Sequence, residues 1–271
     1  MISFQNVSKK YKNNVIGLQN VSFHIEPGEF VFLIGPSGAG KSPLVKLLMK
    51  QVYPDAGRIF FNGEEITKLP ARRVPALRQK IGVVFQDFRL LEDMTVYENL
   101  EYCLNLLGMA KHVKRRRIRE VLELVHLERR AKSYPNQLSG GEQQRVSIAR
   151  AMVTQPTVIV ADEPTGNLDP ETAWEIMRSF ENINRMGTTV IVSTHAKDIV
   201  NTMRRRVIQL SKGRIVRDEA QGLYGEVPGG ADGEPEDGIG LFDPTTSFSV
   251  EDIRRALEQE RRRKQKEELD A

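Results

Sequence analysis

The apolar positions of this 271-residue chain fall into short runs that predict strands separated by helices. Residues 2–7 and 21–25 alternate apolar and polar side chains, which predicts two half-buried strands. Other runs are apolar at almost every position, as is typical of strands that are buried on both faces. These runs are Phe30–Ile34, Ile81–Phe85, Val158–Ala161 and Thr189–Ser193.

The pattern changes to a helical period between residues 95 and 150. Thr95 and Glu98 have the spacing of a capping box, and Val113–Leu127 is amphipathic. Ser139 has the N-cap position of a further helix, whose first turn contains Gly140 and Gly141. Each glycine costs a helix about 1 kcal/mol relative to alanine, so we expect another group to approach this backbone closely.

Composition changes after residue 217. Residues 218–248 are rich in Gly, Pro and acidic side chains, which predicts a flexible acidic linker. Residues 249–271 predict a charged C-terminal helix with a thin apolar stripe. Residues 218–271 carry 7 basic and 15 acidic side chains, so the preceding 217 residues have a net charge of +12. A basic body suits nucleic acid, a membrane surface or bound nucleotide, and charge alone does not choose among them.

Two further features of the sequence indicate the cellular compartment of the protein. No apolar run approaches the roughly 18 residues that a membrane-spanning helix needs, and Met1 is not followed by a signal peptide. Cys103 is the only cysteine, which excludes an intrachain disulfide. We therefore expect a globular protein of the reducing cytosol.

The most specific motif is Gly35–Ser42, which has the form G-x-x-x-x-G-K-S. It follows an apolar strand and precedes a helix-like stretch, Leu44–Gln51. A glycine-rich turn between a strand and a helix aims backbone N–H groups and the positive end of the helix at one point, where polyphosphate fits. Lys41 would reach the β- and γ-phosphates and the Ser42 hydroxyl would bind Mg²⁺, so the motif predicts nucleotide binding.

Polar side chains also follow two later strands. Asp162 and Glu163 come directly after the run 158–161, and His195 follows the run 189–193. Open α/β sheets bind their ligands at the carboxyl ends of parallel strands. We expect Asp162 to hold Mg²⁺ and Glu163 to orient and polarise a water that attacks the γ-phosphate.

Together these motifs resemble ATP-binding-cassette (ABC) ATPases. Ser139–Gln143 matches their signature, Gln86 their Q-loop, Asn167–Asp169 their D-loop and His195 their switch histidine. Tyr11 matches the aromatic residue that stacks on adenine. The resemblance covers residues 1–217 and implies an α/β fold. That fold is a P-loop NTPase core with a mostly parallel sheet, an N-terminal antiparallel β subdomain and an inserted α-helical subdomain at about residues 87–152.

The resemblance implies a site made by two subunits that pair head to tail around ATP. The catalytic residues would be Glu163, His195 and Gln86, and the Mg²⁺ ligands would be Ser42, Gln86 and Asp162. The residues expected to bind ATP are Tyr11, Gly35, Ser37, Gly38, Ala39, Gly40, Lys41, Ser42, Pro43, Ser139, Gly140, Gly141, Glu142 and Asp169.

The segments Ala161–Asp169, Phe85–Leu91 and Val74–Arg78 resemble one branch of this superfamily, which contains FtsE cell-division ATPases and the exporter ATPases LolD and MacB. The last two segments are most similar to the FtsE family. This implies an ATPase at the cytoplasmic face of a bacterial membrane, with an FtsX-like membrane subunit that docks near residues 86–99. Pro43 and the acidic tail depart from the family pattern.

Three other functions stay open at this point. The chain could drive a lipoprotein or drug exporter similar to LolD or MacB. It could also be an ATP-dependent dimerising scaffold that hydrolyses little ATP, because Pro43 alters the phosphate site. A nucleic-acid-handling cassette protein would suit the basic body, but the chain lacks the coiled-coil insertion or tandem cassettes typical of those relatives, so we expect no nucleic-acid partner.

Overall fold

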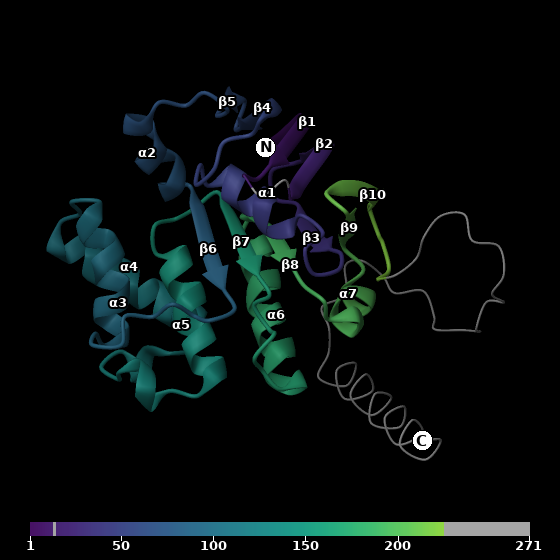
Figure 1. The fold of residues 1–271 in the computed structure, drawn as a ribbon. Helices are drawn as coiled ribbons and strands as arrows, with labels where there is room; N and C mark the ends of the chain where they lie inside the picture. The colour runs from purple at the N-terminus through teal and green to yellow at the C-terminus, as the bar shows by residue number, and fades with distance from the viewer. Residues whose placement is uncertain (13–14, 225–271) are drawn as a thin grey trace, which may run out of the picture.

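A six-stranded sheet forms the centre of the protein, in the strand order β10-β9-β3-β8-β7-β6 (Figure 1). The computed structural model describes residues 1–12 and 15–224. All neighbouring pairs are parallel except β9 and β10, which form an antiparallel hairpin. The strands are β3 (Phe30–Ile34), β6 (Ile81–Phe85), β7 (Val158–Asp162), β8 (Thr189–Ser193), β9 (Arg206–Ser211) and β10 (Arg214–Glu219).

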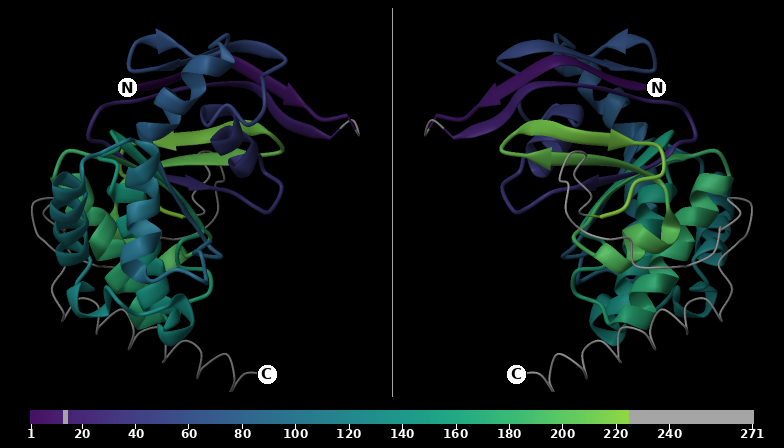
Figure 2. Two further views of the ribbon diagram at one scale, coloured as in Figure 1. Left: turned by 90° about the vertical axis from the view of Figure 1, so that its left-hand side faces the viewer. Right: turned by 90° about the vertical axis from the view of Figure 1, so that its right-hand side faces the viewer.

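A second, antiparallel sheet contains the N-terminal strands in the order β2-β1-β4-β5. These strands are β1 (Ile2–Lys10), β2 (Ile16–Ile25), β4 (Ala56–Phe61) and β5 (Glu64–Glu65). The turn of the β9–β10 hairpin lies against β2, as the two views of Figure 2 show. There Gly213 accepts a hydrogen bond from Gln19 and donates one to the carbonyl of Ala39, at 2.7 and 2.9 Å. The turn thereby joins the two sheets at the glycine-rich loop.

The structure contains the helices predicted after the glycine-rich loop and between residues 95 and 150, with shifted ends, and further helices outside these ranges. They are α1 (Lys41–Leu48), α2 (Val74–Gln79), α3 (Val96–Leu106), α4 (Lys111–Leu124), α5 (Gly140–Met152), α6 (Pro170–Arg185) and α7 (Lys197–Met203). Short 3₁₀ turns cover Ala71–Arg73, Glu128–Arg130 and Pro135–Gln137. The capping boxes at Thr95 and Ser139 are both formed.

The hydrophobic core lies on both faces of the central sheet. Phe30, Phe32 and Ile34 of β3 belong to one buried cluster with apolar residues of α3, α4, α5 and α6. Val31 and Leu33 point to the other face, where they pack with α1 and the antiparallel sheet. Successive side chains of a strand alternate between faces, so a strand buried on both sides must be continuously apolar. The predicted α/β architecture with its helical insertion is confirmed.

The ordered body extends beyond the predicted boundary at residue 217. Strand β10 ends at Glu219, and Asp218 forms a two-point ion pair with Arg206, at 2.7 and 2.8 Å. Residues up to Tyr224 lie against the body, so the start of the predicted linker at residue 218 is wrong by several residues. The rest of that segment and the predicted helix at 249–271 lie outside the described residues.

None of the helices in the described part of the chain has the length and apolar character required to cross a membrane.

Candidate ATPase site

The glycine-rich loop joins β3 to α1 and is built from glycines that no other residue could replace. Gly35 and Gly40 have φ values of 142° and 117°. A Cβ atom on Gly35 would lie 2.2 Å from the carbonyl oxygen of Leu210, and one on Gly40 would lie 2.7 Å from that of Gly17. Only glycine therefore allows the loop to pass between these backbones and present its N–H groups at the start of α1.

Lys41 is the first residue of α1, and its side chain turns back over the loop. The residue is only 8% exposed, and Nζ donates to the carbonyl of Gly35 at 2.6 Å. Nζ also lies 3.0 Å from Nε2 of His195. Burial lowers the pKa of the Lys41 ammonium, although the nearby carboxylates of Glu163 and Asp162 oppose this shift. The negative charge of a bound polyphosphate near Lys41 would favour the protonated form of its side chain.

Pro43 lies in the first turn of α1 and does not disturb it. Helix α1 begins at Lys41, and the first α-helical hydrogen bond runs from the N–H of Leu44 to the carbonyl of Gly40, at 3.2 Å. The N–H groups of a first helical turn have no intrahelical partner, so proline removes no helical bond there. A proline disfavours helical geometry in the residue before it, but Ser42 is nevertheless helical.

Glu163 follows β7 in a backbone conformation that is rare outside glycine, with φ at 47°. Its N–H donates to the carbonyl of Ser193 on the neighbouring strand at 2.9 Å. Strained backbone of this kind is concentrated at functional sites. Burial raises the pKa of the Glu163 carboxyl, while His195 and Lys41 oppose the shift.

His195 faces this carboxylate from the end of β8. Oε2 of Glu163 accepts a hydrogen bond from the backbone N–H of His195 at 3.2 Å. Oε1 lies 3.1 Å from Nε2 of the imidazole, without the geometry of a hydrogen bond. Oε1 is thus a buried carboxylate oxygen without a hydrogen-bond partner among the described residues.

The loop, the strand ends and Gln86 enclose a cavity of about 530 Å³. Its lining consists of Ser37, Gly38, Ala39, Gly40, Lys41, Ser42, Pro43, Gln86, Asp162, Glu163, Gly166 and His195. Most of the residues expected to bind ATP, Mg²⁺ or water are thus brought together. Gly166 is an additional lining residue. A Cβ atom there would lie 2.8 Å from Nε2 of Gln86, which explains why this position is glycine.

Three of the lining side chains carry oxygen donors of the kind that Mg²⁺ prefers. They are the hydroxyl of Ser42, the carboxylate of Asp162 and the carboxamide of Gln86. Nε2 of Gln86 donates to Oδ1 of Asn167 at 3.1 Å, and Nδ2 of Asn167 donates back to the Gln86 carbonyl at 3.3 Å. These oxygen donors fit the expected Mg²⁺. Asn167 of the D-loop holds the Gln86 side chain through the first of these two hydrogen bonds.

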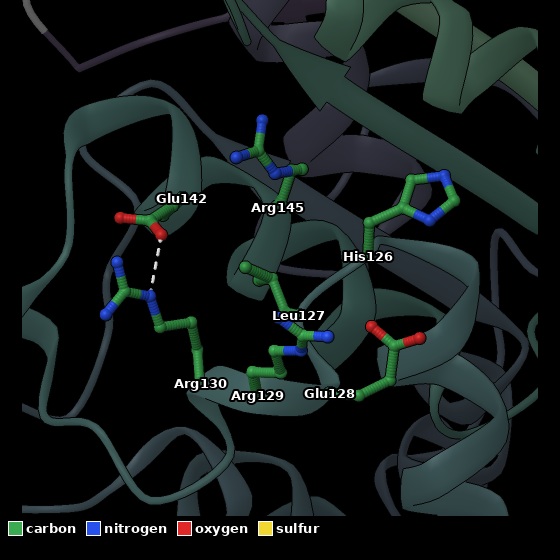
Figure 3. Close-up of a pocket in the computed structure, with 7 residues that line it drawn as sticks. All are labelled: His126, Leu127, Glu128, Arg129, Arg130, Glu142 and Arg145. Atoms are coloured by element: carbon green, nitrogen blue, oxygen red, sulfur yellow. Dashed lines mark hydrogen bonds and ion pairs between the residues drawn. The ribbon is translucent and has the colours of Figure 1, made fainter.

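The signature residues do not line this cavity. Ser139 is exposed at the N-terminus of α5, where its hydroxyl accepts from the N–H of Glu142 at 3.2 Å. The Ser139 N–H donates to Glu142 in return at 2.9 Å, and this bond is the main reason that the Glu142 pKa is lowered. Glu142 also pairs with Arg130 at 2.9 Å, beside a separate pocket of about 380 Å³ (Figure 3).

The two signature glycines differ in their surroundings. A Cβ atom on Gly141 would lie 2.4 Å from Cγ2 of Thr172, so packing against α6 of the same chain explains this glycine. A Cβ atom on Gly140 would meet only ordinary contacts, the nearest being Leu168 at 3.4 Å. Thr172 thus makes the expected close approach at Gly141, and no described residue makes it at Gly140. Asp169 caps α6 through the N–H of Thr172 at 3.0 Å and also lies outside the cavity lining.

Tyr11 lies near the glycine-rich loop without reaching the cavity. Its ring covers Gly17, where an added Cβ would be 2.8 Å from Cε2 of the tyrosine. The Gly17 carbonyl in turn lies against Gly40. The aromatic ring is thus placed beside the loop, on the side of the β1–β2 hairpin.

Sequence patterns gave no indication of one residue at the site. The hydroxyl of Tyr224 lies 3.4 Å from Nδ1 of His195, on the opposite side of the imidazole from Glu163. Tyr224 follows the predicted end of the folded body, in a segment whose composition predicts a linker. No motif or periodicity marks it.

Comparison with known proteins identifies the family. Residues 18–166 match the family model described as ABC transporter. The cell division ATP-binding protein FtsE of Bacillus subtilis (strain 168) is 51% identical over 225 residues, covering 83% of this chain and 99% of that protein. FtsE of Streptococcus pneumoniae serotype 2 is 49% identical over 225 residues, covering 83% of this chain and 98% of that protein.

A solved structure shares the fold. It is a dimeric post-hydrolysis state of the ATP-binding cassette MJ0796 bound to ADP and Pi, which is 36% identical, with a TM-score of 0.73. The match covers 83% of this chain and 100% of the other. With its phosphate loop, paired strand-end carboxylates and signature helix in these positions, the chain belongs to the ABC transporter ATPase family and, within it, to the FtsE family of cell division ATP-binding proteins.

Proposed function

We propose that this protein hydrolyses ATP as the cytoplasmic subunit of a bacterial cell-division complex at the membrane, and that each ATP is enclosed between two copies of the chain. The observation that carries the proposal is the separation of the two halves of the site. The cavity holds the phosphate loop, Glu163 and His195, whereas Ser139 and Gly140 lie outside it.

A second copy would complete the site. Ser139 is exposed, and the N-terminus of a helix offers free N–H groups and positive potential to an anion. Among the described residues of its own chain, Gly140 has no neighbour that requires glycine. Head-to-tail pairing would place this helix end on the γ-phosphate bound by the partner's loop, and the related cassette bound to ADP and Pi is dimeric.

The residues of the cavity have distinct roles in this proposal. Lys41 leaves the Gly35 carbonyl and binds the β- and γ-phosphates. Glu163 accepts a proton from the attacking water, because burial raises the pKa of its carboxyl toward the working pH. The imidazole of His195, which lies beside the Glu163 carboxylate, also contacts the γ-phosphate.

Other residues would bind Mg²⁺ and the adenine ring of ATP. Ser42, Asp162 and Gln86 would hold Mg²⁺, which neutralises charge on the phosphates when bound. The ring of Tyr11 would stack on adenine beside the loop that it already packs against. The main chain of Gly35–Pro43 would supply the remaining phosphate contacts, apart from Pro43 itself, which has no N–H.

The segment 86–99 is the proposed docking site for a helix of an FtsX-like membrane subunit. Buried Asn99 fastens this loop, since its side chain accepts from the N–H of Leu91 at 2.9 Å and donates to the carbonyls of Leu91 and Met94, each at 3.0 Å. Leu91 is 38% exposed on the fastened loop. A rigid loop with an apolar tip suits an apolar helix, and Gln86 would carry the contact into the ATP cavity.

Mixing two inactive variants tests the composite site. Lys41→Ala removes the phosphate lysine and Ser139→Arg blocks the signature face, so each homodimer lacks a working site. A mixed dimer has one intact composite site, and we expect partial ATPase activity that depends on the mixing ratio. Absence of activity at every ratio, with folded variants and mixed dimers confirmed by mass spectrometry, would contradict the proposal.

Site-directed cross-linking tests the docking surface. Leu91→Cys in a Cys103→Ser background should cross-link to the purified membrane subunit, whereas Tyr53→Cys, an exposed control that follows the C-terminal end of α1, should not. Equal labelling of both positions would place the contact elsewhere.

A further inference from the structure

The last described residues, 222–224, form a segment beside His195 that we call the strap. The backbone N–H of Tyr224 donates to Oδ1 of Asn201 on α7 at 2.6 Å. The Leu223 carbonyl accepts from the Arg217 guanidinium, and the Gly222 N–H donates to the Arg205 carbonyl at 3.3 Å. A Cβ atom on Gly222 would lie 2.8 Å from Val207, so glycine permits the strap to lie flat on β9. The segment is thus fastened to the helix that begins two residues after His195.

This strap places a phenol on the outer nitrogen of the imidazole. The Tyr224 hydroxyl lies 3.4 Å from Nδ1 of His195, while Nε2 faces Lys41 at 3.0 Å and Glu163 at 3.1 Å. The tyrosine ring is partly buried against the larger core cluster, and Nζ of Lys197 lies 5.8 Å from its centroid. The imidazole itself is 46% exposed, so it has room to rotate unless something holds it.

We propose that Tyr224 is a positioning residue for ATP hydrolysis, which holds the imidazole of His195 through Nδ1 so that Nε2 points at the γ-phosphate. The inference rests on the proposed role of His195. A neutral histidine that donates through Nε2 has an unprotonated Nδ1, and the hydrogen bond made at the other ring nitrogen favours one tautomer. The Tyr224 hydroxyl is the group that the structure places within reach of Nδ1.

A hydroxyl suits this position for a second reason. It can donate to a bare Nδ1 or accept from a protonated one. In the contact between Lys41 and Nε2 the ammonium can only donate, so Nδ1 of the neutral imidazole carries the proton in this arrangement. When Lys41 moves to the phosphates, Nε2 takes the proton and the Tyr224 hydroxyl turns to donate. Tyr224 therefore supports the ring in both tautomers.

The test is a double-mutant cycle on the full-length chain, measured as ATP turnover. Tyr224→Phe keeps the ring and removes the hydroxyl. We expect kcat to fall roughly three- to tenfold, as for loss of one hydrogen bond, with the KM for ATP unchanged. Tyr102→Phe on α3, whose ring is exposed, is the matched control and should leave kcat unaltered.

The same substitution in a His195→Ala background separates positioning from packing. If Tyr224 acts through the imidazole, Tyr224→Phe should leave the single-turnover rate of ATP hydrolysis unchanged once the imidazole is gone. An equal loss in both backgrounds, or a wild-type kcat for Tyr224→Phe in the otherwise native protein, would overturn the inference. A His195→Ala variant that turns over ATP at the wild-type rate would instead contradict the proposed role of His195.

Discussion

Glu163 and His195 approach each other from neighbouring parallel strands, with a carboxylate oxygen 3.1 Å from Nε2 of the imidazole. Their strands are paired in register, Asp162 opposite Ser193, so the residues that follow each strand arrive at the same edge of the sheet. The backbone N–H of His195 also donates to the carboxylate. The contact thus depends on sheet geometry and on the left-handed backbone of Glu163.

Glu163→Gln should retain ATP binding and lose almost all turnover. The amide keeps the shape of the side chain and its bond from the His195 N–H, but it cannot accept the proton of the attacking water. We expect kcat to fall by about 10²- to 10⁴-fold and the variant to accumulate as an ATP-bound dimer, visible by light scattering. Glu175→Gln on α6, a surface carboxylate that pairs with Arg145, is the control. Near-normal turnover of Glu163→Gln would rule out Glu163 as the base.

Pro43→Thr should bind ATP more tightly without altering the fold. Pro43 lines the cavity but offers neither an N–H nor a hydroxyl to a phosphate. One charge-assisted hydrogen bond contributes about 1.5–3 kcal/mol, so we expect roughly a 10- to 100-fold lower Kd. Calorimetric titration at equal Mg²⁺ measures it, with Pro75→Thr at the exposed start of α2 as the control. Equal affinities for native protein and Pro43→Thr would mean that the neighbouring N–H groups suffice.

Arg150→Met should loosen the loop that follows Gln86. The guanidinium on α5 donates to the carbonyls of Phe88 and Arg89, two consecutive residues with φ near 55° and 51°. Methionine leaves both carbonyls without this donor, at a cost of about 1.5–3 kcal/mol. We expect a lower midpoint of urea unfolding and faster hydrogen exchange at residues 87–91. Arg178→Met on α6 provides a comparison outside this loop, and an unchanged exchange rate in Arg150→Met would show that the loop holds its conformation by itself.

Cys103 should react slowly with thiol reagents in the native protein. It lies on α3 against the core, and burial raises the pKa of its thiol, although Arg150 opposes the shift. Because the thiolate is the reactive form, a raised pKa moves the rise in reactivity to higher pH. Iodoacetamide labelling across pH 7–10 should therefore lag behind that of the urea-unfolded chain at each pH. Equal rates in the two states would show that α3 opens readily.

The fold class and most of the ATP cavity could be predicted from the sequence. Continuous apolar runs require strands covered on both faces, and the phosphate loop follows one of them, so the loop had to lie at the carboxyl edge of a parallel sheet. Glu163 and His195 follow two further runs and reach the same edge for the same reason. Short-range rules also sufficed for the caps at Thr95 and Ser139, since a capping box involves only four consecutive residues.

Contacts between residues far apart in the sequence could not be predicted and became visible in the folded chain. Tyr224 reaches His195 because α7 and β9 fold back between them, and its surrounding composition predicts a linker instead. Arg150 reaches the carbonyls of Phe88 and Arg89 from a helix that starts about fifty residues later in the chain. Gly141 is required by Thr172 on α6, a contact that the signature motif does not encode. Local patterns record the conformation of a few neighbouring residues, whereas these contacts depend on how the helices pack on the sheet.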